Sequence, residues 1–325
     1  MIDSTTRVLV VAAGGPEVLK VERVPTPVPG NGQVLVRMEA AGVAFGDVQL
    51  RQGRLPGKLP TVPGYDVVGR VSALGPDVRN VVVGDRVAAL TMTGGYATDV
   101  LAPAERMVTV PEHLDAGQVA ALVLNYLTAW RMLHRVAHVP SGGSILVLGA
   151  AGGVGSALTE LAQLEGFHVF GTASTHRRPA LEAAGVTVVA DQNDLPKQVD
   201  VTFDSAGGPS LKASRRATTR SGLVVSYGMS FAIAADLSKI GGLSRHVWAL
   251  TKTKITPGPK VVVAMVAGRR TKPAELRSDL SHLIDLLASH RIHPVVTTMP
   301  LTAAADAHRK LEARQVLGKL VLVPQ

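Results

Sequence analysis

Short apolar runs alternate with helical segments through the second half of the chain. The runs cover 145–148, 167–171, 186–190, 199–203 and 223–226. After the first run, apolar residues recur at helical spacing, at Ala157, Leu158, Leu161 and Ala162. This alternation of short strands with helices predicts a parallel sheet, and therefore an α/β fold, in this part of the chain.

The first third of the chain has a different pattern, in which turns and not helices separate the strands. Strand-like runs cover 7–11, 19–24 and 34–40, and prolines and glycines lie between them. This pattern predicts a β-rich first domain.

The end of the chain returns to helical periodicity. Apolar residues over 273–290 predict an amphipathic helix. Thr302 is expected to cap a last helix, and 320–323 predicts a closing strand.

Length and composition allow two domains and exclude several kinds of chemistry. The 325 residues, 46% of them hydrophobic, are enough for two cores. The chain has no cysteine, which excludes disulfides, thiolate nucleophiles and cysteine-bound zinc. Its uncharged runs are shorter than the ~20 apolar residues of a membrane-spanning helix, and no membrane partner is expected. Because the first residues lack the pattern of a secretory signal, we expect a cytoplasmic protein.

Positive charge is concentrated in the last part of the chain. Residues 1–204 contain 16 basic and 19 acidic side chains, whereas 205–325 contain 18 and 6. Aromatic residues make up only 3% of the chain, and no zinc-finger, RNP-like or helix-turn-helix pattern accompanies the charge, so nucleic acid is not expected as a partner. A solvated basic face, an anionic small molecule and an acidic protein are the alternatives.

A glycine-rich stretch joins the first apolar run to the helix that follows it. It reads S-I-L-V-L-G-A-A-G-G-V-G over 144–155 and predicts a strand, a tight turn and a helix. A helix start offers unpaired N–H groups and the positive end of the helix dipole, which bind an anion such as pyrophosphate. The residues expected to bind a dinucleotide are Ala150, Ala151, Gly152, Gly153, Val154 and Gly155.

Two glycines of this turn have separate roles in the prediction. Gly152 lets the anion approach the backbone, and Gly155 lets the helix pack on its strand. The pattern A-x-G-x-x-G departs from G-x-G-x-x-G at its first position, where the chain has Ala150. A glycine turn without a ligand is the alternative, and the repeated strand-helix units argue against it.

The end of the second strand bears on the choice of cofactor. NAD enzymes place an acidic residue there, about 20 residues after the turn, to accept the ribose hydroxyls. This chain has Ala173 at that position, followed by Ser174, Arg177 and Arg178. A 2′-phosphate would meet donors and positive charge, so NADPH is the expected cofactor. The alternative is that both arginines only begin a solvent-facing helix.

Several motifs occur in an order that resembles one known family. They are G-V-A-F-G-D at 42–47, P-G-Y-D-V-V-G at 63–69, G-G-Y-A at 94–97, N-Y-L-T-A-W at 125–130, D-S-A-G-G at 204–208 and G-K-L-V-L at 318–322. Together with the glycine turn they make the whole chain similar to the medium-chain dehydrogenase/reductase superfamily, in its zinc-independent quinone oxidoreductase-like branch.

The resemblance implies an α/β protein with a GroES-like β-rich substrate domain and a Rossmann domain, which is a doubly wound parallel sheet. The substrate domain would cover 1–122 and the Rossmann domain 123–296, and 297–325 would return to the first domain. The active site would lie in a cleft between the two domains. The family usually pairs through an edge strand, so we expect a homodimer, with the apolar run 261–266 as that edge.

The zinc ligands of related enzymes have no counterparts here. The resemblance places Ala44, Tyr65 and Leu124 at the three ligand positions. None is a good zinc ligand, so no metal is expected and a Lewis-acid mechanism at this place is excluded.

Without a metal, the reaction that needs least help is hydride transfer to an activated double bond. The expected substrate is a small hydrophobic conjugated carbonyl compound: an enone, an enal, a quinone or an enoyl thioester carried on coenzyme A or a carrier protein. From the resemblance, Thr128, Ala206, Gly207, Tyr227, Gly228 and Met229 would line the nicotinamide side, and Lys319 would reach the phosphates.

The catalytic donors differ from the pattern of the family. Quinone oxidoreductase-like enzymes have an asparagine and a tyrosine where this chain has Ala44 and Leu55. Tyr65 is the catalytic residue expected in their place, Thr128 is the second catalytic residue expected, and the alternative is that Tyr65 only packs. Asp47 is expected to hold a crowded turn through hydrogen bonds. A dinucleotide-binding regulatory protein with little catalysis, and a specialised biosynthetic reductase or cyclase, are the other functions considered.

Overall fold

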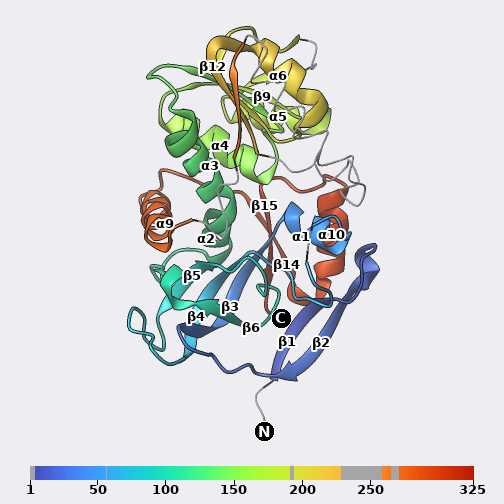
Figure 1. The fold of residues 1–325 in the computed structure, drawn as a ribbon, viewed down its shortest axis with the longest axis vertical. Coiled ribbons are helices and arrows are strands. Elements are labelled where there is room, and N and C mark those ends of the chain that lie inside the picture. Colours follow the sequence, from blue (N-terminus) through green and yellow to red (C-terminus); the bar gives the residue numbers. More distant parts are fainter. Residues whose placement is uncertain (1–3, 56, 191–193, 228–257, 265–270) are drawn as a thin grey trace. The chain divides into compact units, whose positions relative to one another are not determined.

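The computed structural model describes residues 4–55, 57–190, 194–227, 258–264 and 271–325. The chain forms two compact units (Figure 1). The first contains Met1–Leu127 and Ala267–Gln325, and the second contains Thr128–Val266. In this division helix α9 (Pro273–Ala288) belongs to the first unit, whereas we expected 273–288 in the Rossmann domain.

A seven-stranded sheet forms the centre of the first unit. Its order is β14 (Val296–Pro300), β15 (Lys319–Val323), β3 (Gln33–Val43), β4 (Asp66–Leu74), β5 (Arg86–Leu90) and β7 (Val108–Thr109), with β6 (Asp99–Pro103) also paired to β3. A separate antiparallel pair is formed by β1 (Ser4–Val10) and β2 (Leu19–Pro25). Strand β3 pairs with β15, β4 and β6, so segments from both ends of the chain meet on one strand.

Apolar side chains from these strands and from α10 (Ala304–Glu312) form one core. Val36 and Val67 of the early strands are buried with Leu320 and Leu322 of β15. The last strand is therefore part of the hydrophobic centre of the first unit.

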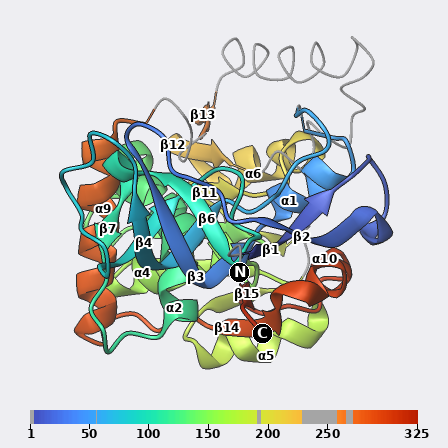
Figure 2. The same ribbon diagram turned by 90° about the horizontal axis from the view of Figure 1, so that it is seen from below.

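Helix α9 packs against β7 and the 3-10 turn η2 (Ala104–Arg106), and β7 lies beside it in Figure 2. Its residues Leu276, Leu280, Leu283, Ile284 and Leu287 are all buried. The amphipathic helix predicted over 273–290 is thus confirmed, and it ends at Ala288.

The predicted helix cap at Thr302 is wrong. Thr302 lies inside the 3-10 turn η8 (Leu301–Ala303), and α10 begins only at Ala304. Its hydroxyl accepts a hydrogen bond from Gln325 Nε2 at 2.7 Å instead of capping helix amides. The other short helices of this unit are η1 (Pro16–Val18), α1 (Phe45–Arg51), α2 (Ala116–Ala121) and the π-helical turn η3 (Leu122–Tyr126).

The second unit contains a six-stranded parallel sheet. Its order is β10 (Thr187–Val189), β9 (His168–Thr172), β8 (Ser144–Leu148), β11 (Val199–Asp204), β12 (Thr218–Ser226) and β13 (Lys260–Val263). Numbered along the chain this is 3-2-1-4-5-6, the order of a dinucleotide-binding sheet. The order reverses between β8 and β11, where such sheets bind their ligand.

Helices connect these strands. Helix α4 (Gly153–Leu164) packs on β8 and β9, α5 (Arg178–Ala183) on β10, and α6 (Leu211–Ala217) on β11 and β12. The unit begins with α3 (Leu127–Arg131) and the π-helical segment η4 (Met132–Ala137), and η5 (Thr175–Arg177) and η7 (Gly208–Ser210) are short turns. Among the described residues no helix combines the length and the apolar character that crossing a bilayer requires.

Candidate functional site

The glycine-rich stretch folds as a strand, a turn and a helix. Strand β8 ends at Leu148, and Gly149 has φ +77°, a conformation that favours glycine. Gly152 is the N-cap of α4, and no side chain caps the first helical turn. The first-turn amides of a twelve-residue helix are therefore left for another acceptor. This arrangement is suited to bind the pyrophosphate of a dinucleotide.

Gly155 holds α4 against the turn. A Cβ at this position would overlap the carbonyl oxygen of Gly149 and lie 2.9 Å from Ala150 Cα. At Gly152, among the described residues, the only close neighbour of a Cβ would be the Gly149 oxygen, at 3.3 Å. Packing therefore requires a glycine at 155, whereas a methyl group at 152 would make one tight contact that a small shift can relieve.

Thr172, at the end of β9, fixes the start of the turn. Its hydroxyl accepts a hydrogen bond from Gly149 N at 3.0 Å, and its carbonyl accepts one from Ala150 N at 2.9 Å. Ser205 adds a third support by donating to the carbonyl of Leu148 at 2.8 Å. Neither residue was predicted from the sequence. A hydroxyl residue directly before Ala173 was the available signal for Thr172.

The two arginines expected at the 2′-phosphate lie in different places. Arg177 Nη1 donates to the carbonyl of Ala151 at 3.3 Å, so its guanidinium lies beside the glycine turn. Arg178 Nη2 donates to the carbonyl of Ala190 at 2.6 Å, just after β10. Ser174 is exposed and precedes η5. The structure thus brings Arg177 to the turn, and it uses Arg178 to hold the end of β10.

The D-S-A-G-G segment forms a turn around a buried carboxylate. Asp204 accepts hydrogen bonds from the amides of Ala206 at 3.0 Å and Gly207 at 2.8 Å, and from the hydroxyls of Ser210 and Ser214. Gly207 has φ +68°, which favours glycine. The loop after β11 is therefore shaped by Asp204, a role that the sequence analysis did not assign.

The next loop is only partly described. Tyr227 N donates to the carbonyl of Asp204 at 3.0 Å, which places Tyr227 after β12 and next to that turn. Burial raises the pKa of the Tyr227 phenol well above its usual value, while a hydrogen bond with Ser205 lowers it. Gly228 and Met229, predicted beside Tyr227, lie outside the described residues.

In the first unit, Tyr65 lies directly against Gly46. A Cβ on Gly46 would approach the Tyr65 hydroxyl oxygen to 2.7 Å, so the ring covers the first turn of α1. Burial, and to a smaller degree the charge of Asp47, raises the pKa of the Tyr65 phenol from 10.0 to about 12. Near neutral pH the phenol therefore keeps its proton and can donate a hydrogen bond to an oxyanion.

Asp47 joins the two segments that flank Tyr65. It is fully buried, and it accepts hydrogen bonds from Ala44 N and Gly64 N, both at 2.8 Å, and from the Tyr96 hydroxyl at 3.3 Å. The prediction that Asp47 holds a crowded turn is confirmed. Burial, only partly offset by the two backbone hydrogen bonds, raises the pKa of Asp47 from 3.8 to about 7.

The hydrogen-bond chain from Asp47 continues to α10. The Tyr96 hydroxyl is 3.2 Å from His308 Nε2, and His308 is fully buried. Burial, with a smaller contribution from the Arg51 charge, lowers the pKa of His308 from 6.5 to about 3. The imidazole is therefore neutral near pH 7. Tyr96 and His308 lie 212 positions apart in the chain, and neither was predicted from the sequence to have a role.

Lys319 forms a buried ion pair instead of an exposed phosphate contact. Its Nζ is 3.3 Å from Asp66 Oδ2, and the two side chains are 2% and 0% exposed. Asp66 Oδ1 also accepts a hydrogen bond from Gly42 N. The Asp66 carboxylate neutralises the lysine charge inside the first unit, and the pair connects β15 to β4. No phosphate role follows from this arrangement.

The positions that bind zinc in related enzymes have no ligating side chains except the phenol of Tyr65. Ala44 is buried and Leu124 is half-buried. No group of three or more His, Cys, Asp or Glu side chains close enough to hold a metal ion occurs in the described part of the chain. Thr128, half-buried on α3, is the first residue of the second unit.

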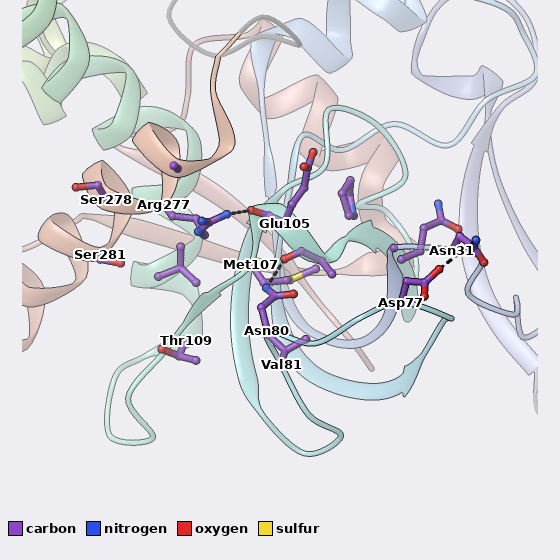
Figure 3. A pocket seen from close by; sticks show the side chains of 16 residues that line it. Asn31, Asp77, Asn80, Val81, Glu105, Met107, Thr109, Arg277, Ser278 and Ser281 are labelled. Carbon is purple, nitrogen blue, oxygen red and sulfur yellow. Dashed lines mark hydrogen bonds between the residues drawn. The ribbon is translucent and has the colours of Figure 1, made fainter.

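A cavity of about 950 Å³ lies elsewhere in the first unit, beside α9 (Figure 3). Arg277 of α9 donates to the carbonyl of Glu105 and so joins α9 to η2, and Asn80 Nδ2 donates to the carbonyl of Ala104 at 2.8 Å in the same turn. None of the predicted site residues lines this cavity. It is therefore not the site that the sequence predicts.

Comparison with known proteins agrees with this geometry. A family model described as "Alcohol dehydrogenase GroES-like domain" matches residues 30–112, and one described as "Zinc-binding dehydrogenase" matches 178–322. The chain is 33% identical to the synaptic vesicle membrane protein VAT-1 homolog of Rattus norvegicus, over 96% of this chain and 82% of that protein. It is 31% identical to the 2-haloacrylate reductase of Burkholderia sp, over 96% of this chain and 97% of that protein.

The structure is similar to that of the Escherichia coli quinone oxidoreductase complexed with NADPH. The TM-score is 0.85 at 27% identity, over 98% of this chain and 100% of the other. The chain belongs to the medium-chain dehydrogenase/reductase superfamily, in its quinone oxidoreductase-like branch. The predicted family is confirmed, and so is the fold class, a GroES-like β-rich domain with a Rossmann parallel sheet.

Proposed function

We propose that this protein is a zinc-independent, NADPH-dependent oxidoreductase that transfers hydride to an activated double bond. The observation that carries the proposal is the glycine turn at the carboxyl end of β8, with uncapped α4 amides and the Arg177 guanidinium beside it. The Escherichia coli structure, complexed with NADPH, supports the same cofactor.

The residues of the turn fit a phosphorylated dinucleotide. Gly152 and the first amides of α4 would hold the pyrophosphate, because they present donors and the positive end of the helix dipole. Arg177 would face the 2′-phosphate, with Ser174 exposed on the same connection. When bound, the nicotinamide supplies the hydride.

On the substrate side, Tyr65 is the proposed hydrogen-bond donor. Its phenol stays protonated near neutral pH because burial raises its pKa. It can then donate to the oxygen on which negative charge develops when hydride reaches the conjugated system. Asp47 positions this group by holding both Ala44 and Gly64.

The proposed substrates are enones, enals, quinones and enoyl thioesters, including thioesters carried on coenzyme A or a carrier protein. The Burkholderia relative is a 2-haloacrylate reductase, and a 2-haloacrylate contains a double bond conjugated to a carboxylate. The apolar residues Ala44 and Leu55, at the two positions where polar groups were expected, favour a hydrophobic substrate.

The test is consumption of NADPH absorbance by the purified protein with a panel of these compounds, followed by product mass. Reduction of at least one compound, with a mass increase of two hydrogens, is expected. The Tyr65→Phe variant is expected to lower turnover about 10- to 100-fold with unchanged NADPH affinity, the usual range for loss of one donor to an oxyanion. Unchanged turnover in this variant would remove Tyr65 from the mechanism, without affecting the cofactor proposal.

A second candidate function is a dinucleotide-binding regulatory protein with little catalysis. The absence of the asparagine and the tyrosine usual in the family, replaced by Ala44 and Leu55, favours it. NADPH binding without consumption across the whole panel would select this alternative. A product with changed connectivity would instead select a biosynthetic reductase or cyclase.

We also propose a homodimer that pairs through β13. Within the described residues β13 is the last strand of the parallel sheet, paired only with β12, and Val263 is 40% exposed. Light scattering is expected to give twice the chain mass of 33.9 kDa. Ala264 N donates to the carbonyl of Ser226 in β12, and amides alternate in direction along a strand, so Val263 N faces the unpaired side of β13. A Val263→Pro variant removes an amide donor at this edge and is expected to shift the mass toward the monomer.

A further inference from the structure

The second unit has a basic cavity at the amino-terminal ends of its strands, on the side of the sheet opposite the glycine turn. The cavity has a volume of about 670 Å³. Its lining residues are Gln198, Lys212, Arg215, Arg216, Thr218, Thr219, Arg220, Gly258 and Pro259. They lie where β11, β12 and β13 begin, whereas the turn at Gly149 follows the end of β8. In a parallel sheet all strands begin on one side and end on the opposite side, so this cavity is separate from the proposed dinucleotide site.

Four cationic side chains surround this cavity: Lys212, Arg215, Arg216 and Arg220. No acidic residue is among its described lining residues. No salt bridge found within the described part of the chain neutralises Lys212, Arg216 or Arg220, and all three are exposed. Four of the 18 basic side chains of 205–325 therefore line one concave surface.

The helix dipole favours the positions of only two of these four cations. Arg215 and Arg216 are in the last turn of α6, where a cation is favourable. Lys212 is in the first turn, where a cation is unfavourable, and it is four residues from Arg216, so the two like charges share a face. Arg220 is on β12. Lys212 and Arg220 thus add repulsion that the fold does not need.

Arg215 is fixed as one wall of the cavity. Its Nη1 is 3.4 Å from the carbonyl oxygen of Pro259, to which it donates. Its Nη2 is 2.8 Å from the place where a Cβ on Gly258 would lie, so the guanidinium fills the space of the missing side chain. The group is held in place before any ligand binds, which lowers the entropic cost of binding.

We propose that this cavity binds a small molecule that carries two or more phosphate groups. Its volume lies within the range of ~300–1,000 Å³ that small-molecule sites usually have. Four cations match several negative charges, and arginine is suited to bidentate contacts with phosphate. Thr219, half-buried near the start of β12, adds a neutral hydroxyl donor. The proposal does not depend on the proposed function of the protein.

The test is isothermal titration of the whole protein, saturated with NADPH and at constant ionic strength, with inorganic tripolyphosphate. Saturable one-to-one binding is expected, and the Lys212→Glu/Arg216→Glu variant is expected to weaken it at least tenfold. The control is Lys310→Glu, an exposed lysine on helix α10 of the other unit, which should leave the affinity unchanged. Parallel titrations with ATP and with tripolyphosphate distinguish a nucleotide from an inorganic polyphosphate.

Three results would overturn the proposal: no binding to the wild-type protein, equal binding to the charge-reversed variant, or equal binding of sulfate. Should charge reversal prevent folding, the milder Lys212→Gln variant replaces it. This variant is expected to raise the melting temperature without anion, because it removes like-charge repulsion, and to lose most of the rise that tripolyphosphate causes in the wild type. An undiminished rise would equally contradict the proposal.

Discussion

Arg177 and Arg178 are adjacent in the chain and hold two different carbonyl groups. Arg177 donates to Ala151 in the glycine turn, and Arg178 donates to Ala190 after β10. We expect Arg177→Gln to weaken NADPH binding about 10- to 100-fold with little change for NADH, because a hydrogen bond to a charged group contributes about 1.5–3 kcal/mol. Fluorescence titration with both cofactors measures this.

The matched control is Arg178→Gln. It removes the bond to Ala190 and is expected to leave the ratio of NADPH to NADH affinity unchanged. Equal losses for the two cofactors in Arg177→Gln, or a loss of NADPH preference in Arg178→Gln, would contradict this assignment.

The buried groups Asp47 and His308 give the stability of the protein two opposite dependences on pH. Burial raises the pKa of Asp47 from 3.8 to about 7, so its contribution to stability is fully present below about pH 4 and is lost as the pH rises to about 7. Burial lowers the pKa of His308 from 6.5 to about 3, so its contribution is present above about pH 6.5 and is lost on acidification. Between about pH 4 and 6.5 the two effects oppose each other.

Removing either group is therefore expected to reveal the pH dependence of stability that the other group causes. In His308→Gln the free energy of unfolding should fall by up to about 1.4 kcal/mol per pH unit as the pH rises from 4.5 to 6.5, relative to the wild type. In Asp47→Asn it should rise by a similar amount over the same range. Urea unfolding at both pH values measures the slopes, and slopes of the same sign in both variants would show that the two groups do not oppose each other.

At the scale of elements, two glycines of the turn between β8 and α4 allow the stability of the protein and its binding of NADPH to be changed separately. Gly155→Ala places a methyl group against the Gly149 carbonyl, and we expect it to lower the free energy of unfolding by about 1–3 kcal/mol. Gly152→Ala has an allowed φ of −81° and brings its Cβ to 3.3 Å from the Gly149 oxygen, a milder contact than at 155, so it should lower stability less than Gly155→Ala while weakening NADPH binding. Calorimetry and NADPH titration of both variants check this, and a stable Gly155→Ala protein would contradict the packing role.

The sequence predicted the strands that are mainly apolar and missed a strand segment that is polar. β8, β9, β10 and β11 follow the predicted runs closely, because strands covered on both faces consist mainly of apolar residues. β12 begins at Thr218 and not at residue 223, since its first five residues are polar or glycine. These residues extend past the apolar core, where hydrophobicity carries no signal.

The site was predictable where its residues are close together in the chain. The glycine turn is a contiguous pattern, so its residues were found from spacing alone. Tyr96 and His308 meet across 212 positions, and Lys319 meets Asp66 across 253, so only the fold brings these groups together. Neither contact has a local sequence pattern, and the phosphate role expected for Lys319 came from resemblance alone.

At the scale of the molecule, the Lys319–Asp66 pair fastens β15 into the first unit. Lys319→Met leaves a buried carboxylate without its partner, and we expect the free energy of unfolding to fall by about 3–5 kcal/mol. The Asp66→Asn/Lys319→Met double variant should recover part of this loss, because no uncompensated charge stays buried. Urea unfolding measures both, and NADPH affinity should be unchanged; a weaker affinity with intact stability would restore a phosphate role for Lys319.

Pairing of β15 with β3 also has a consequence for how the protein folds during its synthesis. The second unit is one continuous segment, so all of its strands have been synthesised before β15 leaves the ribosome. During that interval the β15 side of β3 has no partner, and apolar residues that Leu320 and Leu322 later cover are open to other chains. The parallel sheet can thus finish folding first, and the nascent chain is most prone to aggregate through the unit whose synthesis began earliest.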